Sequence, residues 1–208
     1  MKNLIRTILS KTSSLFLFRT RNQSSISKKA KFKKCHFLYC INNSIEIGDS
    51  KFINCNFMIH GANNRLKIGD GCLFNNVDFY ISDGSAIIIE NNTRVFGHTH
   101  FASCENCRLE IGNDCLISSN VNIRNTDSHS IVDMNGKRLN YGKDISIGNH
   151  VWICNNVTIL KGSKINNNSI IGNGSLVNKE FDESNVVICG SPGSIKKRGV
   201  TWVDKKIS

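Results

Sequence analysis

The sequence predicts an all-β solenoid of about seven triangular coils, and two observations lead to this fold class. Aliphatic residues recur at intervals of six without a break in the C-terminal half, and shorter sets of the same repeat occur upstream. Neither an α-helix, with about 3.6 residues per turn, nor a strand with alternating faces produces a six-residue period. A chain with three short strands per coil does, if each strand contributes one inward aliphatic side chain.

Length and composition agree with one globular domain. The chain has 208 residues, which suits about one domain of roughly 100–200 residues. The contents of 39% hydrophobic and 21% charged residues, with a single proline, exclude a disordered or Pro-rich linker protein. No apolar run reaches about 18 residues, so we expect no membrane-spanning helix.

The formal net charge of +11 is concentrated at the N-terminus. Residues 1–34 contain ten basic residues and no acidic one, which leaves 17 basic and 16 acidic residues in 35–208. The body of the protein is therefore nearly neutral. No aromatic platform or recognition motif accompanies the basic segment, so we expect no nucleic-acid partner.

The first element is an N-terminal arm, residues 1–25, expected to form a short, partly amphipathic basic helix. Arg6 and Lys11 interrupt its apolar clusters and no small-residue cleavage site follows, so it is not a typical signal peptide. Such a helix packs on the body or touches an anionic membrane surface. We therefore predict a cytoplasmic protein with peripheral contact, through residues 1–34, to the inner face of the membrane or to an anionic glycan.

The nine cysteines favour the same location. Their number is odd, and only Cys104 and Cys107 have a Cys-x-x-Cys spacing, without a second pair at zinc-ribbon distance. We expect reduced thiols that fill small core positions in a reducing compartment.

The early coils are predicted from triplets of the repeat. The inward residues are expected to be Ile26, Phe32, Leu38; Ile47, Ile53, Ile59; Ile68, Phe74, Tyr80; Ile89, Val95, Phe101; Ile111, Ile117 and Ile123. Successive triplets start 21, 21, 21 and 22 residues apart, more than the 18 of three hexads, so the corners hold extra residues such as 61–64. A recurring Ile-Gly-Asn/Asp is expected to supply residues for unusual corner dihedrals.

An extruded loop, residues 126–143, follows these coils. The distance from Ile111 to Ile147 is 36 residues, 18 more than one coil requires. A polar loop on a regular solenoid is where function is usually placed, and this loop holds His129 two residues after Asp127.

The late coils are the most regular part of the chain. The inward residues are expected to be Ile147, Ile153, Ile159, Ile165, Ile171 and Val177. We place the solenoid domain at 26–195 and a basic C-terminal tail at 196–208.

The late repeats, residues 147–180, and the closing VVICGSPGSIKKR, residues 186–198, resemble the hexapeptide-repeat acyltransferases, which fold as left-handed parallel β-helices. The segment NTDSHSIVDMNGKRLN, residues 125–140, is most similar to members that O-acetylate bacterial surface polysaccharides such as capsule, lipopolysaccharide and polysialic acid. The resemblance covers residues 26–198. It implies a homotrimer that binds acetyl-CoA in a cleft between neighbouring helices and acetylates a hydroxyl of a polysaccharide or its precursor.

Two residues are predicted to be catalytic. Attack by a sugar hydroxyl on a thioester needs a base, and a histidine is suited to that role at neutral pH. His129 stands where the family has its catalytic histidine, and Asp127 is expected to support it. The resemblance also implies an essential role for Trp152 of the Val-Trp-Ile motif, whose indole would pack on the pantetheine arm or a sugar ring.

The remaining site residues follow from the same resemblance. His98 and His100 replace asparagines of galactoside-type members, and His100 is expected to bind the acceptor substrate. Contacts with the cofactor are expected from Asn155, Asn173, Asn178, Lys179 and Lys197. No metal is expected, because the zinc-binding relatives need a second histidine where this chain has Met134.

Alternative functions remain open at this point. One is N-acetylation of an amino sugar nucleotide or O-acetylation of a small molecule such as a simple sugar or serine. The serine enzymes carry a long helical N-terminal domain, which an arm of 25 residues cannot supply. Another is a non-enzymatic β-helix scaffold or binding protein.

Overall fold

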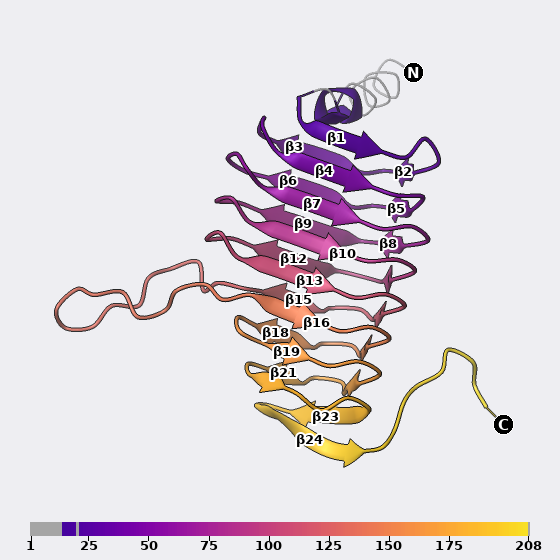
Figure 1. The fold of residues 1–208 in the computed structure, drawn as a ribbon, viewed down its shortest axis with the longest axis vertical. Coiled ribbons are helices and arrows are strands. Elements are labelled where there is room, and N and C mark those ends of the chain that lie inside the picture. Colours follow the sequence, from indigo (N-terminus) through magenta and orange to yellow (C-terminus); the bar gives the residue numbers. More distant parts are fainter. Residues whose placement is uncertain (1–13, 20, 208) are drawn as a thin grey trace.

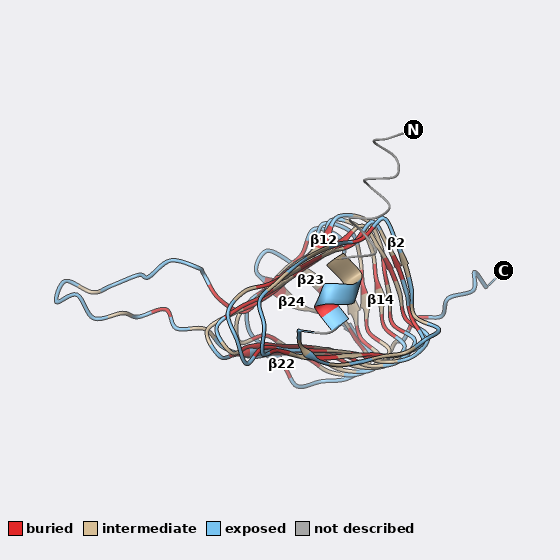
Figure 2. Ribbon diagram, turned by 90° about the horizontal axis from the view of Figure 1, so that it is seen from above, coloured by how far each residue is buried: buried red, intermediate tan, exposed pale blue. Residues whose placement is uncertain are grey.

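The computed structural model describes residues 14–19 and 21–207, which form a left-handed parallel β-helix with a triangular cross-section (Figures 1 and 2). Three parallel sheets make the three faces of the prism. The all-β solenoid predicted from the six-residue period is therefore confirmed.

Every third strand belongs to the same sheet. The first sheet contains β1 (Gln23–Ile26), β4 (Ser44–Ile47), β7 (Arg65–Ile68), β10 (Ala86–Ile89), β13 (Arg108–Ile111), β16 (Ile145–Ile147), β19 (Lys164–Ile165) and β22 (Glu180–Phe181). The second contains β2 (Lys31–Lys33), β5 (Lys51–Ile53), β8 (Leu73–Asn75), β11 (Arg94–Val95), β14 (Leu116–Ile117), β17 (Trp152–Ile153), β20 (Ile170–Ile171), β23 (Val186–Gly190) and β24 (Gly193–Arg198). The third contains β3 (His36–Tyr39), β6 (Asn56–Ile59), β9 (Val77–Ile81), β12 (Thr99–Ser103), β15 (Asn122–Arg124), β18 (Thr158–Leu160) and β21 (Leu176–Val177).

The described chain makes eight coils, one more than the sequence predicts. The eighth coil consists of β22 and β23. The six-residue period does not predict this coil, because a coil of three hexads places partners 18 residues apart. The inward residues Phe181 and Ile188 instead follow their partners Ile165 and Ile171 by 16 and 17 residues.

The core is one continuous column of buried side chains. Aromatic rings fill the early coils: Phe57 stacks on Phe37 and Phe79 with centroid distances of 5.0 and 4.9 Å. On the third sheet, the inward residues from Ile123 onward are aliphatic. Because each ring is sandwiched between rings of the neighbouring coils, the column stabilises the stack in both directions along the axis.

Three of the expected inward residues point outward. Leu38, Ile53 and Tyr80 lie on the outer face, and their neighbours Phe37, Phe52 and Phe79 take the inward positions. The extra corner residues fall at different places in successive coils, and a shift of one residue along a strand exchanges its two faces.

The Ile-Gly-Asn/Asp motif works differently from the prediction. Its acidic or amide side chain accepts a backbone N–H of the preceding coil. Asn113 Oδ1 accepts the N–H of Asn91 at 3.0 Å, and Asn149 Oδ1 accepts the N–H of Asn113 at 2.8 Å. The glycine makes room for this bond, since a Cβ on Gly112 would lie 2.5 Å from Asn149 Oδ1. The left-handed conformation occurs at the next residue, for example Asp114 with φ of 57°.

A helical segment at residues 14–19 closes the N-terminal end of the column (Figure 1). Phe18 is fully buried, with its ring 5.0 Å from that of Phe37 and 5.3 Å from that of Tyr39. The rest of the expected arm, residues 1–13, lies outside the described residues. No helix of the described chain has the length and apolar character needed to cross a bilayer.

Both expected domain boundaries fall inside strands. β1 begins before residue 26, and β24 runs antiparallel to β23 as far as Arg198, so residues 196–198 belong to the last strand and not to the tail. Five of the nine cysteines are buried at core positions, as expected: Cys35, Cys55, Cys72, Cys107 and Cys115. Burial raises the pKa of the Cys115 thiol to about 11, so it stays protonated.

The loop at 126–143 leaves the solenoid between β15 and β16, at the edge shared by the third and first sheets (Figure 1). Seen along the axis, it projects from the side of the prism opposite the second sheet (Figure 2). This separation decides which residues one chain brings together.

Candidate active site

The extruded loop is an ordered hairpin. Val132 and Arg138 form an antiparallel bridge, and the N–H of Leu139 donates to the carbonyl oxygen of Ile131 at 2.8 Å. Asp133 Oδ1 closes the tip by accepting the backbone N–H groups of Asn135 and Lys137, each at 2.9 Å. These bonds fix the path of the loop away from the body.

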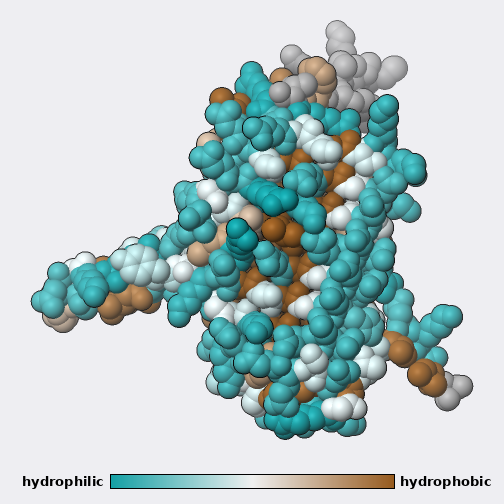
Figure 3. Space-filling model, in the orientation of Figure 1, coloured by the Kyte–Doolittle hydropathy of each residue, from teal (hydrophilic) through white to brown (hydrophobic). Residues whose placement is uncertain are grey.

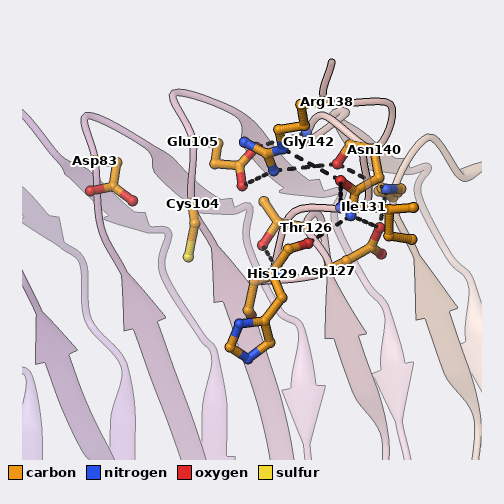
Figure 4. Close-up of polar contacts among 12 residues, drawn as sticks. Asp83, Cys104, Glu105, Thr126, Asp127, His129, Ile131, Arg138, Asn140 and Gly142 are labelled. Atoms are coloured by element: carbon orange, nitrogen blue, oxygen red, sulfur yellow. Dashed lines mark hydrogen bonds and ion pairs between the residues drawn. The ribbon is translucent and has the colours of Figure 1, made fainter. Parts of the chain in front are cut away.

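Asn140 ties the two sides of the loop together at its base. Its amide nitrogen donates to Asp127 Oδ2 at 2.8 Å and to the carbonyl oxygen of His129 at 2.7 Å, and its Oδ1 accepts the N–H of Ile131 at 2.7 Å (Figure 4). Only 8% of the Asn140 surface is exposed. One buried amide therefore fixes the backbone on both sides of the predicted base.

Asp127 contacts the loop base and not the imidazole of His129. Its carboxylate forms an ion pair with Lys161 and accepts the Asn140 amide. These bonds, with Lys161 the stronger influence, hold the pKa of Asp127 below its usual value. Among the described residues, Asp127 is linked to His129 only through Asn140, which bonds the His129 backbone carbonyl.

A second anchor holds the far end of the loop. Glu105 lies in the corner after β12, where Oε1 pairs with Arg138 at 2.6 Å and Oε2 accepts the N–H of Gly142 at 2.9 Å. The Arg138 hydrogen bond lowers the pKa of Glu105, and the Arg138 guanidinium covers the ring of Tyr141 at 5.0 Å. Both ends of the loop are thus pinned to the solenoid.

The imidazole of His129 is exposed and points away from this network (Figure 4). Within residues 14–19 and 21–207, its ring nitrogens make no hydrogen bond with another side chain or with the backbone. The backbone of His129 is fixed while its ring nitrogens stay available, which is the arrangement that a general base requires.

A cavity of about 190 Å³ lies beside His129 on the outer face of the third sheet. It is lined by Tyr80, His100, Ala102, Cys104, Arg124, Thr126 and Ser128. Ser128 is the residue before His129, and Thr126 Oγ1 accepts its N–H at 3.4 Å. The expected acceptor residue His100 therefore lies in a hollow next to the expected base, whereas His98 lies in the preceding corner with φ of 53°.

We expect His100 to be neutral at pH 7. Burial lowers the pKa of His100; the negative charge of Asp78 opposes this in part, and the positive charge of Arg124 lowers the pKa by a smaller amount. The unfolded chain binds the proton near pH 6.5, so stability should fall as the pH drops from 6.5 through the folded-state pKa. An NMR titration of the imidazole signals measures the pKa of His100 directly. A midpoint at or above 6.5 would refute the expected lowering of this pKa.

Trp152 lies on the second sheet, across the prism from His129. Its indole N–H donates to Ser118 Oγ at 3.4 Å. The C-terminal segment passes over this face: Trp202 is 8% exposed, stacks on His150 at 4.5 Å and donates its indole N–H to the His150 carbonyl oxygen at 2.8 Å. An ion pair at 3.0 Å between Arg94 and Asp204 fixes the segment further along. One chain therefore does not bring Trp152 and His129 together.

We expect Trp202 to shield Trp152, because their rings lie 6.1 Å apart. The chain has only two tryptophans, so in a Trp202 variant all tryptophan fluorescence comes from Trp152. Trp202→Ala should make this fluorescence more accessible to acrylamide than Trp202→Phe, which keeps a ring on His150. Equal quenching in the two variants would show that the C-terminal segment does not cover Trp152.

The expected cofactor residues lie on the last three coils but in separate places. Asn155 and Asn173 share the corner between the second and third sheets, where Gly174 N–H donates to the Asn155 carbonyl oxygen at 3.0 Å. Residues 178–179 lie at the next corner, with Lys179 Nζ 5.3 Å above the ring of Phe181. Lys197 is exposed on β24. Within one chain these residues line the end of the prism without forming one pocket.

The described residues contain no group of three His, Cys, Asp or Glu side chains placed to hold a metal ion. The chemistry available at the loop is that of an imidazole base beside a small polar cavity.

Comparison with known proteins relates this geometry to a family. The sequence-family model described as "Bacterial transferase hexapeptide (six repeats)" matches residues 144–179. The solved structure of the polysialic acid O-acetyltransferase OatWY is 34% identical, with a TM-score of 0.73 over 90% of both chains. This chain belongs to the hexapeptide-repeat acyltransferase family.

Other relatives of this hexapeptide-repeat chain have similar descriptions. The polySia-specific acetyltransferase NeuO is 26% identical, with a TM-score of 0.69 over 89% of this chain and 91% of that one. Curated polysialic acid O-acetyltransferases of Neisseria meningitidis and of Escherichia coli O1:K1 / APEC are each 36% identical, over 128 and 126 residues. The chain spans 59% and 40% of the lengths of these two proteins.

Several residues of the candidate site were not predicted from the sequence. The loop is held by four side chains whose partners lie 9 to 37 positions away in the sequence: Asn140, Lys161, Glu105 and Arg138. The polar residues at both ends of the loop were a visible signal, since a hairpin must return to its starting point. Trp202 lies beyond the repeats, in a segment without a motif.

Proposed function

We propose that this protein is an O-acetyltransferase that moves an acetyl group from acetyl-CoA to a sugar hydroxyl of a bacterial surface polysaccharide or its precursor. The observation that carries the proposal is His129, whose imidazole is unpaired among the described residues and is held on a pinned hairpin beside a cavity. The 34% identity to a polysialic acid O-acetyltransferase over 90% of both chains supports the same reaction.

In the proposed reaction, a ring nitrogen of His129 accepts the proton of the sugar hydroxyl as its oxygen attacks the thioester carbonyl carbon. The new carbon–oxygen bond gives a tetrahedral intermediate, and backbone N–H groups near the loop would stabilise its oxyanion. The carbon–sulfur bond then breaks, and the departing thiolate takes the proton from the imidazolium. The products are the acetylated sugar and CoA.

The proposed site is shared between two subunits of a homotrimer. His129 and Trp152 lie on opposite sides of one prism, so both reach one acetyl group only if they come from different chains (Figure 2). The loop presents exposed apolar side chains that suit a neighbouring subunit: Ile131, Val132, Met134 and Leu139 are 52% to 101% exposed. The space-filling view shows this apolar patch on the projecting loop (Figure 3).

The last three coils are the proposed contact region for acetyl-CoA. Corner amides at Asn155 and Asn173 can bond the pantetheine arm, and Asn178 and the cations Lys179 and Lys197 can meet the polar and phosphate groups. No metal has a part in this proposal.

For location, we propose a cytoplasmic protein that docks peripherally. The N-terminal coil combines exposed apolar side chains, Phe16 at 65% and Leu38 at 60%, with basic residues of segment 1–34. This combination suits an anionic membrane surface or an anionic glycan near the machinery that assembles polysaccharide.

The decisive assay follows CoA release and analyses the acceptor by mass spectrometry. Polysialic acid, other capsular and lipopolysaccharide repeats, amino sugar nucleotides and monosaccharides are each incubated with enzyme and acetyl-CoA. The proposal predicts an ester-linked acetyl group on a polysaccharide or its precursor. Transfer only to an amine would favour the N-acetyltransferase alternative, and a protein that never binds acetyl-CoA would be a scaffold.

A further inference from the structure

Side chains of three neighbouring strands shape the cavity beside His129. Tyr80, Ala102 and Arg124 occupy the same outward column of the third sheet, on β9, β12 and β15. Because Ala102 is much smaller than its two neighbours, it leaves the hollow of about 190 Å³ between them. Tyr80 therefore forms an aromatic wall and Arg124 a cationic wall, with His100 at the side.

The guanidinium group of Arg124 has a buried nitrogen, Nε, without a hydrogen-bond acceptor among the described residues. No carboxylate of the described chain forms an ion pair with its guanidinium. Asp78, an acidic residue of the same sheet, is in register with His100 and accepts the Asn56 amide. A buried donor without an acceptor is unfavourable until a ligand provides one.

We propose that this cavity is a subsite for the carboxylate of an acidic sugar unit and that Arg124 determines this specificity. The inference rests on the proposed function and deepens it. A guanidinium suits a carboxylate because its N–H groups match the two oxygens. The ring of Tyr80 offers an apolar face to the sugar, and Thr126 and Ser128 place hydroxyl groups at the edge.

The position along the axis favours a sugar carboxylate over a phosphate of CoA. The cavity lies on coils three to five, on the N-terminal side of the loop, whereas the proposed cofactor residues lie on coils six to eight. Acceptor and cofactor would then approach His129 from opposite sides. A carboxylate held by Arg124 would fix the sugar whose hydroxyl faces the base.

Binding tests this subsite without relying on catalysis. The full-length protein is titrated with the methyl glycoside of N-acetylneuraminic acid, which carries a carboxylate, and with its uncharged methyl ester. We expect the acid to bind at least about tenfold more tightly than the ester to the wild type. Arg124→Gln and Arg124→Lys should remove most of this preference, with ester binding unchanged. Arg65→Gln, on the first sheet, should behave like the wild type.

Four results would overturn the inference: no acid binding by the wild type, equal binding of acid and ester, unchanged acid binding by both Arg124 variants, or weaker CoA binding by these variants in place of weaker acid binding. The last result would assign the anion to a cofactor phosphate. The Lys variant keeps the positive charge and guards against misfolding of the Gln variant. Failure of the proposed function would look different, since acetyl transfer would be absent while the preference for acid over ester remained.

Discussion

His129→Ala is expected to lower kcat/KM for acetyl transfer by about 100- to 10,000-fold, the contribution typical of a general base. The imidazole is exposed and, within the described residues, makes no side-chain hydrogen bond, so its removal should leave the melting temperature unchanged. The backbone carbonyl that accepts the Asn140 amide is retained in the variant. Steady-state CoA release and thermal unfolding measure the two effects separately.

The control for this substitution is binding. Acetyl-CoA should bind His129→Ala as tightly as the wild type, because the proposed cofactor residues lie on other coils. A variant that keeps more than about a tenth of the wild-type rate would show that another group accepts the proton.

Asn140→Ala is expected to lower kcat by about 100-fold although Asn140 does not touch the reacting atoms in this account. Its loss removes one of the two hydrogen-bond partners of Asp127, which keeps Lys161, and removes the bonds that fix the backbone at His129 and Ile131. A displacement of the base by about 1 Å is enough for such a loss. Hydrogen exchange of the loop amides should rise, while the solenoid core keeps its melting temperature because the loop lies outside it.

Asn135→Ala is the matched control. Asn135 lies at the exposed tip of the same hairpin, and only its backbone N–H takes part in the turn with Asp133. Activity and loop exchange should stay at wild-type values in this variant. If Asn135→Ala and Asn140→Ala behave alike, the effect belongs to the loop in general and not to the buried amide.

The sequence predicted the fold well because its six-residue period has few other physical explanations. The prediction failed in detail where corners vary: Leu38, Ile53 and Tyr80 were expected inside but lie outside. The six-residue period predicts how many residues separate two inward positions. Which residue of a strand points inward also depends on where the extra corner residue lies. The error has a functional side, since Tyr80 forms a wall of the cavity because it points outward.

The site was predictable as a set of residues and not as an arrangement. The interruption of the repeat located the loop and His129, and the resemblance supplied Trp152 and the cofactor residues. The internal supports, Asn140 and Glu105, depend on contacts that only the folded hairpin creates. The separation of His129 from Trp152 follows from the sheet to which each strand belongs, so it emerged only from the topology.

In the proposed trimer, each active site takes His129 from one subunit and Trp152 from its neighbour. Co-expression of His129→Ala and Trp152→Ala chains with different affinity tags tests it, after purification through both tags and comparison with each parent variant. In a trimer that contains both variants, about one site in three combines an intact histidine with an intact tryptophan, so the doubly purified mixture should regain roughly a third of wild-type activity from two inactive parents. A mixture as inactive as its parents, or a Trp152→Ala parent that is fully active, would show that the site is not shared between subunits in this way.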